Sequence, residues 1–491
     1  MTVRLPSDNH GLFRLASAVV GTITLVRIAV LITTPLQLYP DEAQYWWWAQ
    51  APDLGYFSKP PLIAWVIWLT TRFSDAEWAI RLSSPLLHGA TALVMFQIGR
   101  CAYDARVGFW AALAYVTLPG ISYSSGLIST DVPLLFCWAA ALYAFFRAIN
   151  RDNWGWPLLC GVALGFGLLA KYAMLYFLLG AFIAAAASTA ARRLVFSSRG
   201  VLILAIGLLI LSPNLIWNAA HGWPTLAHTV ANANWSHAGY DFGSAFAFIL
   251  GQFGVVGPLM MAGWIGGLLT LRRSRESGDS DIILACFSVP ILLLIVLQSF
   301  IAEANANWAA PAYVAAVPLA VGTLLRWWHG RLLWLSIALG TAAMIGLWAG
   351  ELSPALADRA GFGNALKRQE GWRELGAAVV SQSRTGSYDA IAVANRSVLA
   401  ELLYYARPRF APVRAWDRTT APRDHFQMTI PLVPGTWHML LVTSPDEGSA
   451  MLGSFDSHRL LRSVSIPLGR HHERVLALYD ALFYRGPQSG R

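Results

Sequence analysis

The stretch LYPDEAQYWWWAQAPDLGYFSKPP, residues 38–61, directly follows a long apolar run at about Leu12–Leu36. A run of this length can cross the hydrocarbon core of a bilayer, which takes about 20 residues. The stretch itself joins two adjacent acids, Asp41 and Glu42, to three tryptophans and to Lys59, which precedes two prolines. The sequence therefore places acids, a cation and aromatic side chains together at a membrane surface.

The composition of the chain indicates a polytopic membrane protein. Of its 491 residues, 56% are hydrophobic and 13% are charged, whereas soluble domains carry about 25% charged residues. The net charge of +9 is assigned to arginines in short loops that orient a membrane protein, and not to nucleic-acid binding. The four cysteines lie in or beside apolar segments, which argues against a disulfide framework. The first apolar run is too long for a signal peptide and is expected to remain as a helix.

The apolar runs predict about eleven helices that cross the membrane. They are expected at about Leu12–Leu36, Trp78–Ile98, Val107–Tyr123, Val132–Phe146, Trp156–Ala170, Tyr172–Ala187, Val201–Trp217, Ala245–Leu271, Ile282–Ile301, Trp308–Leu325 and Leu332–Ala349. The apolar run Pro61–Phe73 is too short to cross a core of about 30 Å, and we expect an interfacial or re-entrant helix there.

Basic residues between these runs predict the orientation of the chain. With about eleven crossings, every loop rich in arginine falls on one side, which should be the cytoplasm. The arginines concerned are Arg4, Arg14, Arg100, Arg106, Arg147, Arg151, Arg192, Arg193, Arg199, Arg272, Arg273, Arg275, Arg326 and Arg331. The outer side then holds Asp41, Glu42, Lys59 and the tail after Gly350.

The tail predicts a second domain of different character. The segments YDAIAVA (388–394), WHMLLVTS (437–444) and HRLLRSVSI (458–466) are typical of strands, and SVLAELLYYA (397–406) is typical of a helix. The expected fold is therefore an all-α polytopic membrane domain, residues 1–350, with interfacial helices, followed by a small α/β domain, residues 351–491.

Acidic residues mark two outer loops. Asp41 and Glu42 follow the first helix, and Asp131 lies in GLISTDVP (126–133), before the fourth helix. Charge at membrane depth is costly, so a functional role is the default interpretation, and acids from different loops indicate a site that binds a hard cation or accepts a proton. The structural alternative is that Asp41 and Asp131 cap the helices that follow them, with Trp46–Trp48 as headgroup anchors.

Three cations lie on the same outer side. They are Lys59 in FSKPP, Arg81 near the outer end of the second helix, and Lys171 between the fifth and sixth helices. The prolines restrict the backbone beside Lys59, so its ammonium group suits a fixed site for a lipid phosphate. For Lys171 the alternative is that its side chain extends to the interface.

Amides and aromatic side chains form a fourth group. HGWPTLAHTVANANWSHAGYD (221–241) begins with His221, and AEANANW (302–308) contains Asn305, Asn307 and Trp308. Amides bond to sugar hydroxyls and an indole face stacks on C–H surfaces, so both loops suit a sugar or its acceptor. The alternative is a polar loop with an interfacial tryptophan.

Together these features resemble the GT-C glycosyltransferases, specifically the branch of the protein O-mannosyltransferases and the aminoarabinose lipid A transferases. The resemblance rests on Asp41 with Glu42 after the first helix, on the Lys59–Pro60 motif, on Asp131 before the fourth helix and on Lys171 after the fifth. It covers residues 13–308.

Ser58 departs from the aminoarabinose transferases, which have a glutamate before the lysine–proline motif. The segments DEAQYW and SKPP are more similar to bacterial enzymes that decorate lipopolysaccharide, including galacturonosyltransferases.

The resemblance implies a glycosyltransferase of the bacterial inner membrane. Such an enzyme moves a sugar from a polyprenyl-phosphate donor to lipid A, lipopolysaccharide or another envelope glycan at the periplasmic face, where the tail would also lie. The alternatives are an enzyme like the protein O-mannosyltransferases or, in a different class, a flippase or transporter of lipid-linked sugars. A transporter of that kind should show repeated halves and ionisable groups near mid-membrane, and the sequence has no evident internal repeat.

The resemblance also implies roles for the candidate residues. Asp41 would act as a base or orient the acceptor hydroxyl, with Glu42 and Asp131 as further acids of the site. The donor phosphate would meet Lys59, Lys171 and Arg81, and the sugar or acceptor would meet His221, Asn305, Asn307 and Trp308. A divalent cation such as Mg²⁺ or Mn²⁺ is left open, with Glu42 and Asp131 as its ligands if one takes part.

Overall fold

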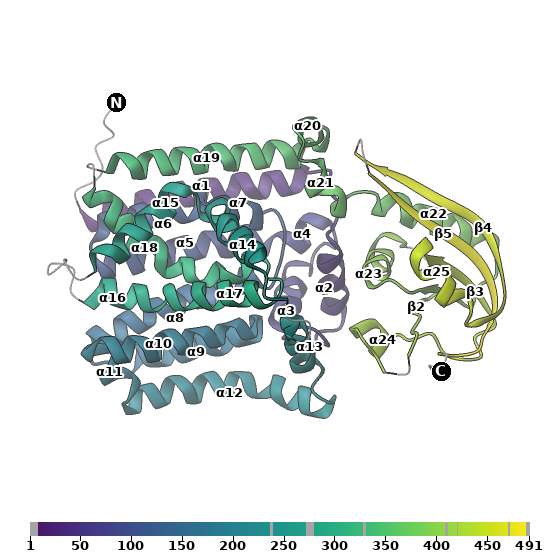
Figure 1. Cartoon of the computed structure of the whole chain (residues 1–491), viewed down its shortest axis with the longest axis horizontal. Helices are drawn as coiled ribbons and strands as arrows, with labels where there is room; N and C mark the ends of the chain where they lie inside the picture. The colour runs from purple at the N-terminus through teal and green to yellow at the C-terminus, as the bar shows by residue number, and fades with distance from the viewer. Residues whose placement is uncertain are drawn as a thin grey trace. The chain divides into compact units, whose positions relative to one another are not determined.

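The computed structural model describes residues 8–235, 239–271, 279–327, 330–407, 411–419, 421–469 and 472–487. The chain forms two compact units (Figure 1). The helical unit contains the residues up to Ile32, Lys59–Val66 and Arg81–Trp348, and the sheet unit contains Thr33–Ser58, Ile67–Ile80 and Ala349–Arg491. The sheet unit therefore combines residues 33–58 and 67–80 with the tail. Arg4, Arg272, Arg273 and Arg275, which entered the orientation argument, lie outside the described residues.

The helical unit is built from long apolar helices that run in the same general direction, among them α1, α9, α12 and α19 in Figure 1. Its elements are α1 (Asn9–Thr33), α5 (Ser83–Ala102), α6 (Ala105–Thr117), α7 (Pro119–Ser124), α8 (Asp131–Asn150), α9 (Gly155–Ala170), η1 (Tyr172–Met174), α10 (Leu175–Ala187), α11 (Thr189–Val195), α12 (Ser198–Ala220), α13 (Pro224–Ala233), α14 (Phe242–Val256), α15 (Pro258–Thr270), α16 (Asp279–Cys286), α17 (Val289–Ile301), η3 (Ala306–Ala309), α18 (Ala310–Arg326) and α19 (Arg331–Leu352). The short helices α3 (Leu62–Thr70) and α4 (Glu77–Arg81) each span a boundary between the segments of the two units.

Within the described residues, seven helices are long and apolar enough to cross a membrane, and a bent pair of helices forms an eighth if it is counted as one span. This confirms the predicted polytopic helical class. The short helix α3 also lies where the run Pro61–Phe73 predicted one. The buried centre of the unit includes the aromatic rings of Trp138, Phe145, Phe177 and Phe287, which meet edge-on or tilted.

Several of the predicted helices are broken, among them the runs Ala245–Leu271 and Val107–Tyr123. The run Ala245–Leu271 forms α14 and α15, which meet at an angle of 107°, because Gly257 has a positive φ of 85° and Pro258 cannot continue the hydrogen-bond ladder. The run Val107–Tyr123 breaks into α6 and α7, because Leu118, which precedes Pro119, is not helical.

A buried arginine supports the end of α6. Arg27 of α1 is 2% exposed, and its Nη2 donates to the carbonyl oxygen of Val116 at 2.5 Å. The last carbonyls of a helix have no partner within the helix, and a cation there also complements the helix dipole. Arg27 thus stabilises the break between α6 and α7.

The sheet unit is an α/β fold, as the tail predicted. Its helices are α2 (Pro40–Gln50), α20 (Pro354–Arg359), α21 (Gly363–Leu366), η5 (Lys367–Gln369), α22 (Trp372–Thr385), α23 (Arg396–Tyr405), α24 (His425–Thr429) and α25 (Pro445–Leu452). Its strands are β1 (Ala390–Val393), β2 (Val413–Ala415), β3 (His438–Thr443), β4 (Phe455–Leu468) and β5 (His472–Tyr484). The strand order is β2-β1-β3-β5-β4, with β2, β1 and β3 parallel and β5 antiparallel to both of its neighbours. Helix α23 and strands β1, β3 and β4 were predicted, whereas β2 and β5 were not.

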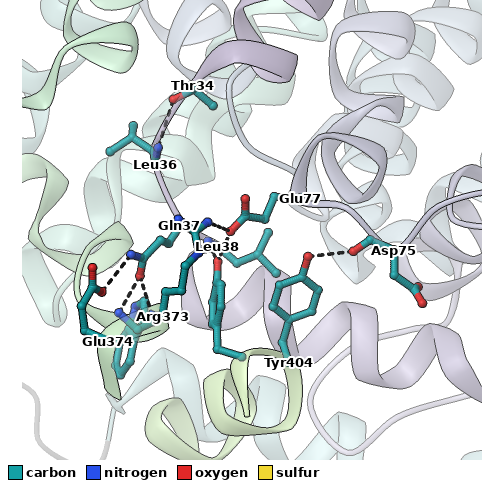
Figure 2. Close-up of polar contacts among 11 residues, drawn as sticks. Thr34, Leu36, Gln37, Leu38, Asp75, Glu77, Arg373, Glu374 and Tyr404 are labelled. Carbon is teal, nitrogen blue, oxygen red and sulfur yellow. Dashed lines mark hydrogen bonds and ion pairs between the residues drawn. The ribbon is translucent and has the colours of Figure 1, made fainter. Parts of the chain in front are cut away.

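Polar contacts attach the loop after α1 to the tail inside the sheet unit (Figure 2). The side chain of Gln37 accepts the backbone N–H groups of Trp372 and Arg373 and donates to Glu374. Farther along the loop, the carbonyl of Asp75 accepts a 2.7 Å hydrogen bond from the Tyr404 hydroxyl. These bonds satisfy the polar groups at both ends of the loop, so α2 is held against the tail.

Candidate functional site

Three predicted residues from three separate loops meet in the helical unit. Lys171 Nζ lies 2.7 Å from Oδ1 of Asp131, and Nδ2 of Asn307 lies 2.6 Å from Oδ2 of the same carboxylate. The side chain of Asp131 is 8% exposed and that of Lys171 is 20% exposed. The buried charge of Asp131 is therefore neutralised by a cation and both of its oxygens are hydrogen-bonded, as a buried carboxylate requires.

The position of Lys171 follows from a helix end and a buried amide network. Helix α9 stops at Ala170, and Lys171 is extended, with φ −162° and ψ 135°. The next residue, Tyr172, donates its hydroxyl hydrogen to Asn214 at 2.7 Å, and Asn218 lies 3.4 Å from the same hydroxyl. Asn214 and Asn218 are fully buried one turn apart on α12. They were not among the predicted site residues, although two asparagines inside an apolar span were the available signal.

Asn307 is positioned by a second buried polar pair. Gln252 of α14 donates to the carbonyl oxygen of Ala306 at 3.3 Å and accepts the hydroxyl of Tyr313 at 2.7 Å. These bonds fix η3, the 3₁₀ turn that carries Asn307. A glutamine that is 1% exposed in an apolar helix is stable only when its amide is paired in this way.

The contacts of Asp131 and Lys171 differ from those of a helix cap and of a side chain that only extends to an interface. The side chain of Asp131 forms no cap at α8, whose N-cap is Thr130; it binds Lys171 and Asn307 instead. Lys171 does not simply extend to an interface, because its ammonium group ends on that carboxylate. The two residues thus form one arrangement with Asn307.

The remaining predicted site residues of the helical unit lie outside the arrangement of Asp131, Lys171 and Asn307. His221 lies on the face of the Trp217 ring, 4.1 Å between ring centres, and its Nδ1 is 2.8 Å from the Trp217 carbonyl oxygen. Asn305 is exposed and its carbonyl accepts the N–H of Trp308, which is half-buried. Arg81, at the end of α4, is 1% exposed, and Lys59 is half-buried beside Pro60.

The acids Asp41 and Glu42 lie on α2 in the sheet unit. Glu42 is 1% exposed, and its Oε2 accepts the backbone N–H of Tyr39 at 2.9 Å, so Glu42 caps its own helix. The structural alternative, in which Asp41 caps α2, does not hold, because the N-cap is Tyr39. Oδ1 of Asp41 lies 3.0 Å from Nη1 of Arg396, which also donates to Gln44. Arg396 was not predicted, because it is 355 residues away in sequence.

The expectation that Trp46–Trp48 anchor α2 at the headgroups is wrong for two of the three tryptophans. Trp48 is 1% exposed and stacks on Tyr56 with 4.4 Å between ring centres. Trp46 is 3% exposed, and its indole N–H donates to Asp75 at 2.9 Å. Because a buried indole needs a partner for its N–H and a surface for its ring, α2 is held by protein contacts on this side.

Burial changes the acidity of two groups in the sheet unit. It raises the pKa of the Tyr39 phenol, against the opposing effect of the Arg368 guanidinium. It also raises the pKa of Asp424, although the N–H groups of Gln427 and Phe426 and the nearby Arg396 act in the other direction. Arg396 therefore lies near two acids, and it contacts Asp41 directly.

The contacts of Glu42 and Asp131 give little support for a bound divalent cation. No group of three or more histidine, cysteine, aspartate or glutamate side chains in the described part of the chain is arranged to hold a metal ion. Both oxygens of Asp131 are engaged by Lys171 and Asn307, and Glu42 caps α2. These two acids do not fit the metal-ligand role, and the mechanism below assigns no step to a metal.

Comparison with known proteins places the chain in a family. The dolichyl-phosphate-mannose-protein mannosyltransferase family matches residues 58–217. The chain is 34% identical over 463 residues to the lipid A galacturonosyltransferase RgtD of Rhizobium johnstonii, covering 93% of this chain and 95% of that protein. It is 26% identical over 209 residues to the lipopolysaccharide core galacturonosyltransferase RgtB of the same organism, covering 41% of each.

A solved structure shows the same fold. ArnT from Cupriavidus metallidurans, bound to undecaprenyl phosphate, superimposes with a TM-score of 0.65 at 18% sequence identity, covering 94% of this chain and 97% of that one. The helical unit and the small C-terminal sheet thus have an ArnT-like fold. With the match to RgtD over nearly its whole length, the chain belongs to the GT-C family of membrane glycosyltransferases that contains the lipid A galacturonosyltransferase RgtD.

Proposed function

We propose that the enzyme transfers a galacturonosyl group from a polyprenyl-phosphate donor to lipid A or a related lipopolysaccharide acceptor. The observation that carries this proposal is the Lys171 ammonium at the end of an apolar helix, where it can meet a lipid phosphate. It is held by Asp131, whose other oxygen accepts a hydrogen bond from Asn307. The names of RgtD and RgtB support the sugar and the acceptor, and the undecaprenyl phosphate in the ArnT structure supports the donor class.

The proposal includes an orientation in the bacterial inner membrane. We infer eleven crossings, because α9, α10 and the broken pair α6–α7 are apolar helices that run beside the spans of sufficient length. The N-terminus is then cytoplasmic, residues 1–350 form the membrane domain, and the tail from residue 351 is periplasmic. A reporter active only in the cytoplasm, fused after Arg491, should give no signal; a strong signal would overturn this orientation.

The reaction is a displacement at the anomeric carbon of the donor sugar. The acceptor hydroxyl oxygen forms the new C–O bond, and its proton passes to the Asp41 carboxylate. The bond between the anomeric carbon and the phosphate oxygen breaks, and the polyprenyl phosphate leaves with the electron pair. Lys171, Lys59 and Arg81 stabilise the charge that develops on this leaving group, which is the form of catalysis that fixed cations supply best.

The contacts of Lys171, Asp131 and Asn307 suit binding of the donor phosphate and the sugar. An ammonium group has three N–H donors, and the bond to Asp131 uses one of them, so two are left for phosphate oxygens. Asn307 donates to Asp131 through its NH₂ group, and its carbonyl oxygen can accept a sugar hydroxyl. Asn305, Trp308 and His221 are kept as contacts for the sugar or the acceptor.

Donor binding should depend on two lysines. Changing Lys59 or Lys171 to Met keeps the chain length of the side chain but removes the cation. We expect weaker binding of polyprenyl phosphate to both variants in detergent, measured by titration. Unchanged affinity in Lys59→Met would leave that lysine with a structural role only.

The proposed reaction is tested with purified protein in vesicles that contain radiolabelled polyprenyl-phosphate galacturonic acid and lipid A. A transferase moves the label into lipid A. If the label instead crosses the bilayer still attached to the polyprenyl phosphate, the protein is a flippase and the proposed function is wrong.

A further inference from the structure

An arginine of the tail contacts the acid proposed to act on the acceptor. Arg396 is the first residue of α23, and its Nη1 lies 3.0 Å from Oδ1 of Asp41 and also donates to Oε1 of Gln44. Asp41 and Gln44 are three residues apart on α2 and therefore share one face of that helix. A single guanidinium nitrogen thus spans one turn of the helix that carries the acid.

The arginine is held by well-defined structure on its own side. Asn395 caps α23 through Oδ1, which accepts the N–H groups of Ser397 at 2.9 Å and Val398 at 3.2 Å. Its amide nitrogen also donates to Glu447 at 3.2 Å. The backbone from which Arg396 extends is therefore fixed at the start of α23.

Helices α2 and α23 are also packed directly against each other within the sheet unit. Trp46 of α2 meets the ring of Tyr404 of α23 edge-on, with 5.0 Å between ring centres. The Arg407 guanidinium, just beyond α23, lies 4.4 Å from the centre of each of these two rings. Because aromatic packing of this kind fixes the spacing of the helices, the distance between Arg396 and Asp41 is set by more than their own attraction.

The simplest alternative is an ordinary surface ion pair. The side chains of Asp41 and Arg396 are 43% and 39% exposed, and pairs at such positions contribute little to stability. Gln44 argues against a casual contact, because it is 3% exposed and its buried amide oxygen needs the donor that Arg396 provides. The guanidinium is thus anchored at one buried point and holds the carboxylate at a second.

The geometry points to a positioning role: we propose that Arg396 orients Asp41 for the transfer reaction, so that the tail takes part in catalysis through this residue. Arg396 binds Oδ1, and Oδ2 accepts no hydrogen bond from the side chains of the described residues, so this oxygen is the one presented to the acceptor hydroxyl. The inference rests on the proposed function, because it takes Asp41 as the group that receives the acceptor proton.

The test compares four variants in the galacturonosyl-transfer assay. Arg396→Met should lower kcat by about 10–100-fold with little change in KM for the donor. A displacement of a catalytic group by about 1 Å reduces the rate by a factor of this order. Arg396→Lys should recover part of kcat, because it keeps a cation near both partners. Gln44→Leu, which removes the buried anchor alone, should lose less. The matched control Arg459→Met removes an exposed arginine that pairs with Asp480 in the same unit and should keep wild-type kcat.

A double variant separates positioning from a general structural effect. If Arg396 acts through Asp41, adding Arg396→Met to Asp41→Asn should cause no further loss of kcat. An equal loss in the presence and absence of the Asp41 carboxylate, or an Arg396→Met enzyme as active as the Arg459→Met control, would overturn the inference. If the wild-type protein transfers no sugar at all, the proposed function itself has failed.

Thermal unfolding in detergent completes the comparison. Arg396→Met should unfold moderately below Arg459→Met, because it removes an ion pair and also leaves the buried amide oxygen of Gln44 without its donor. If Arg396→Met unfolds far below the control while Arg396→Lys and Gln44→Leu retain full activity, the residue is structural and the positioning role is wrong.

Discussion

The helical unit and the sheet unit each contain an acid, a cation and an amide, but they connect them in opposite ways. In the helical unit the carboxylate of Asp131 is at the centre, with Lys171 on one oxygen and Asn307 on the other. In the sheet unit the cation is at the centre, and Arg396 binds both Asp41 and Gln44. In the first arrangement, Lys171 keeps N–H donors for a further partner. In the second arrangement, Asp41 keeps one carboxylate oxygen for a further partner.

This difference is consistent with the two halves of the proposed reaction. Remaining ammonium donors suit an anionic leaving group, and a remaining carboxylate oxygen suits the hydroxyl that attacks. The exposures agree with these roles, since Asp131 is 8% exposed and Asp41 is 43% exposed. In the proposed function, Lys171 of the helical unit acts on the donor phosphate and Asp41 of the sheet unit acts on the acceptor.

The largest effect on stability is expected where the buried pair is broken. Lys171→Met leaves the Asp131 carboxylate without its cation, and we expect a loss of about 3–5 kcal/mol in the free energy of unfolding. The double variant Lys171→Met with Asp131→Asn removes both charges and keeps an amide beside Asn307, so it should recover most of the stability. Chemical or thermal unfolding in detergent measures both.

Turnover should not recover with stability in this double variant, because the phosphate has lost its cation. A double variant that is both stable and fully active would show that the pair has only a structural role. Lys171 and Asp131 would then have no part in binding the donor phosphate.

The sequence predicted much of this molecule and missed what depends on distant packing. Long apolar runs are local signals, so the spans, the short helix α3 and most of the tail could be predicted from sequence patterns. The breaks at Leu118–Pro119 and Gly257–Pro258 each contain a proline that is evident in the sequence. They were not predicted, because the helices were assigned from mean hydropathy over long windows, which a single proline hardly changes. The sheet partners β2 and β5 are set by pairing across the sheet, which no single segment shows.

The candidate site was predicted in part for the same reason. Asp131, Lys171 and Asn307 were each proposed from their own loops, and the structure brings these three together. The sequence could not show that Lys171 and Asn307 bind the same carboxylate, because they lie 40 and 176 positions away from Asp131. Arg396 was missed because an arginine at the start of a helix in the tail has no local feature that points to Asp41.

A smaller effect is expected at the amide of the buried group. Asn307→Ala removes the hydrogen bond to Oδ2 of Asp131 and should cost about 1–3 kcal/mol in the free energy of unfolding, since a buried charged oxygen loses a donor. Asn307→Asp should be worse than Asn307→Ala, because it sets a second carboxylate against the first. Equal stability of these two variants would contradict the 2.6 Å contact between Asn307 and Asp131.

The smallest effect concerns pH and the sheet unit. Burial raises the pKa of Asp424 above its ordinary value of 3.8, so the folded state favours the protonated form and the free energy of unfolding should fall as the pH rises from 3.8 through the raised pKa. Asp424→Asn keeps a helix cap at α24 but has no such titration. Unfolding temperatures measured across this pH range should converge at the acidic end and favour the variant at neutral pH; parallel curves would contradict the assignment.

The most direct test of the account is mass spectrometry of lipid A after incubation with polyprenyl-phosphate galacturonic acid and the enzyme. With the wild-type protein, lipid A should gain the mass of one anhydrohexuronate unit, and free polyprenyl phosphate should appear in equal amount. With Asp41→Asn, which folds but lacks the accepting carboxylate, the gain should be about 10²–10⁴-fold slower. Lipid A of unchanged mass with the wild-type protein, or an Asp41→Asn enzyme that works at the normal rate, would contradict the account.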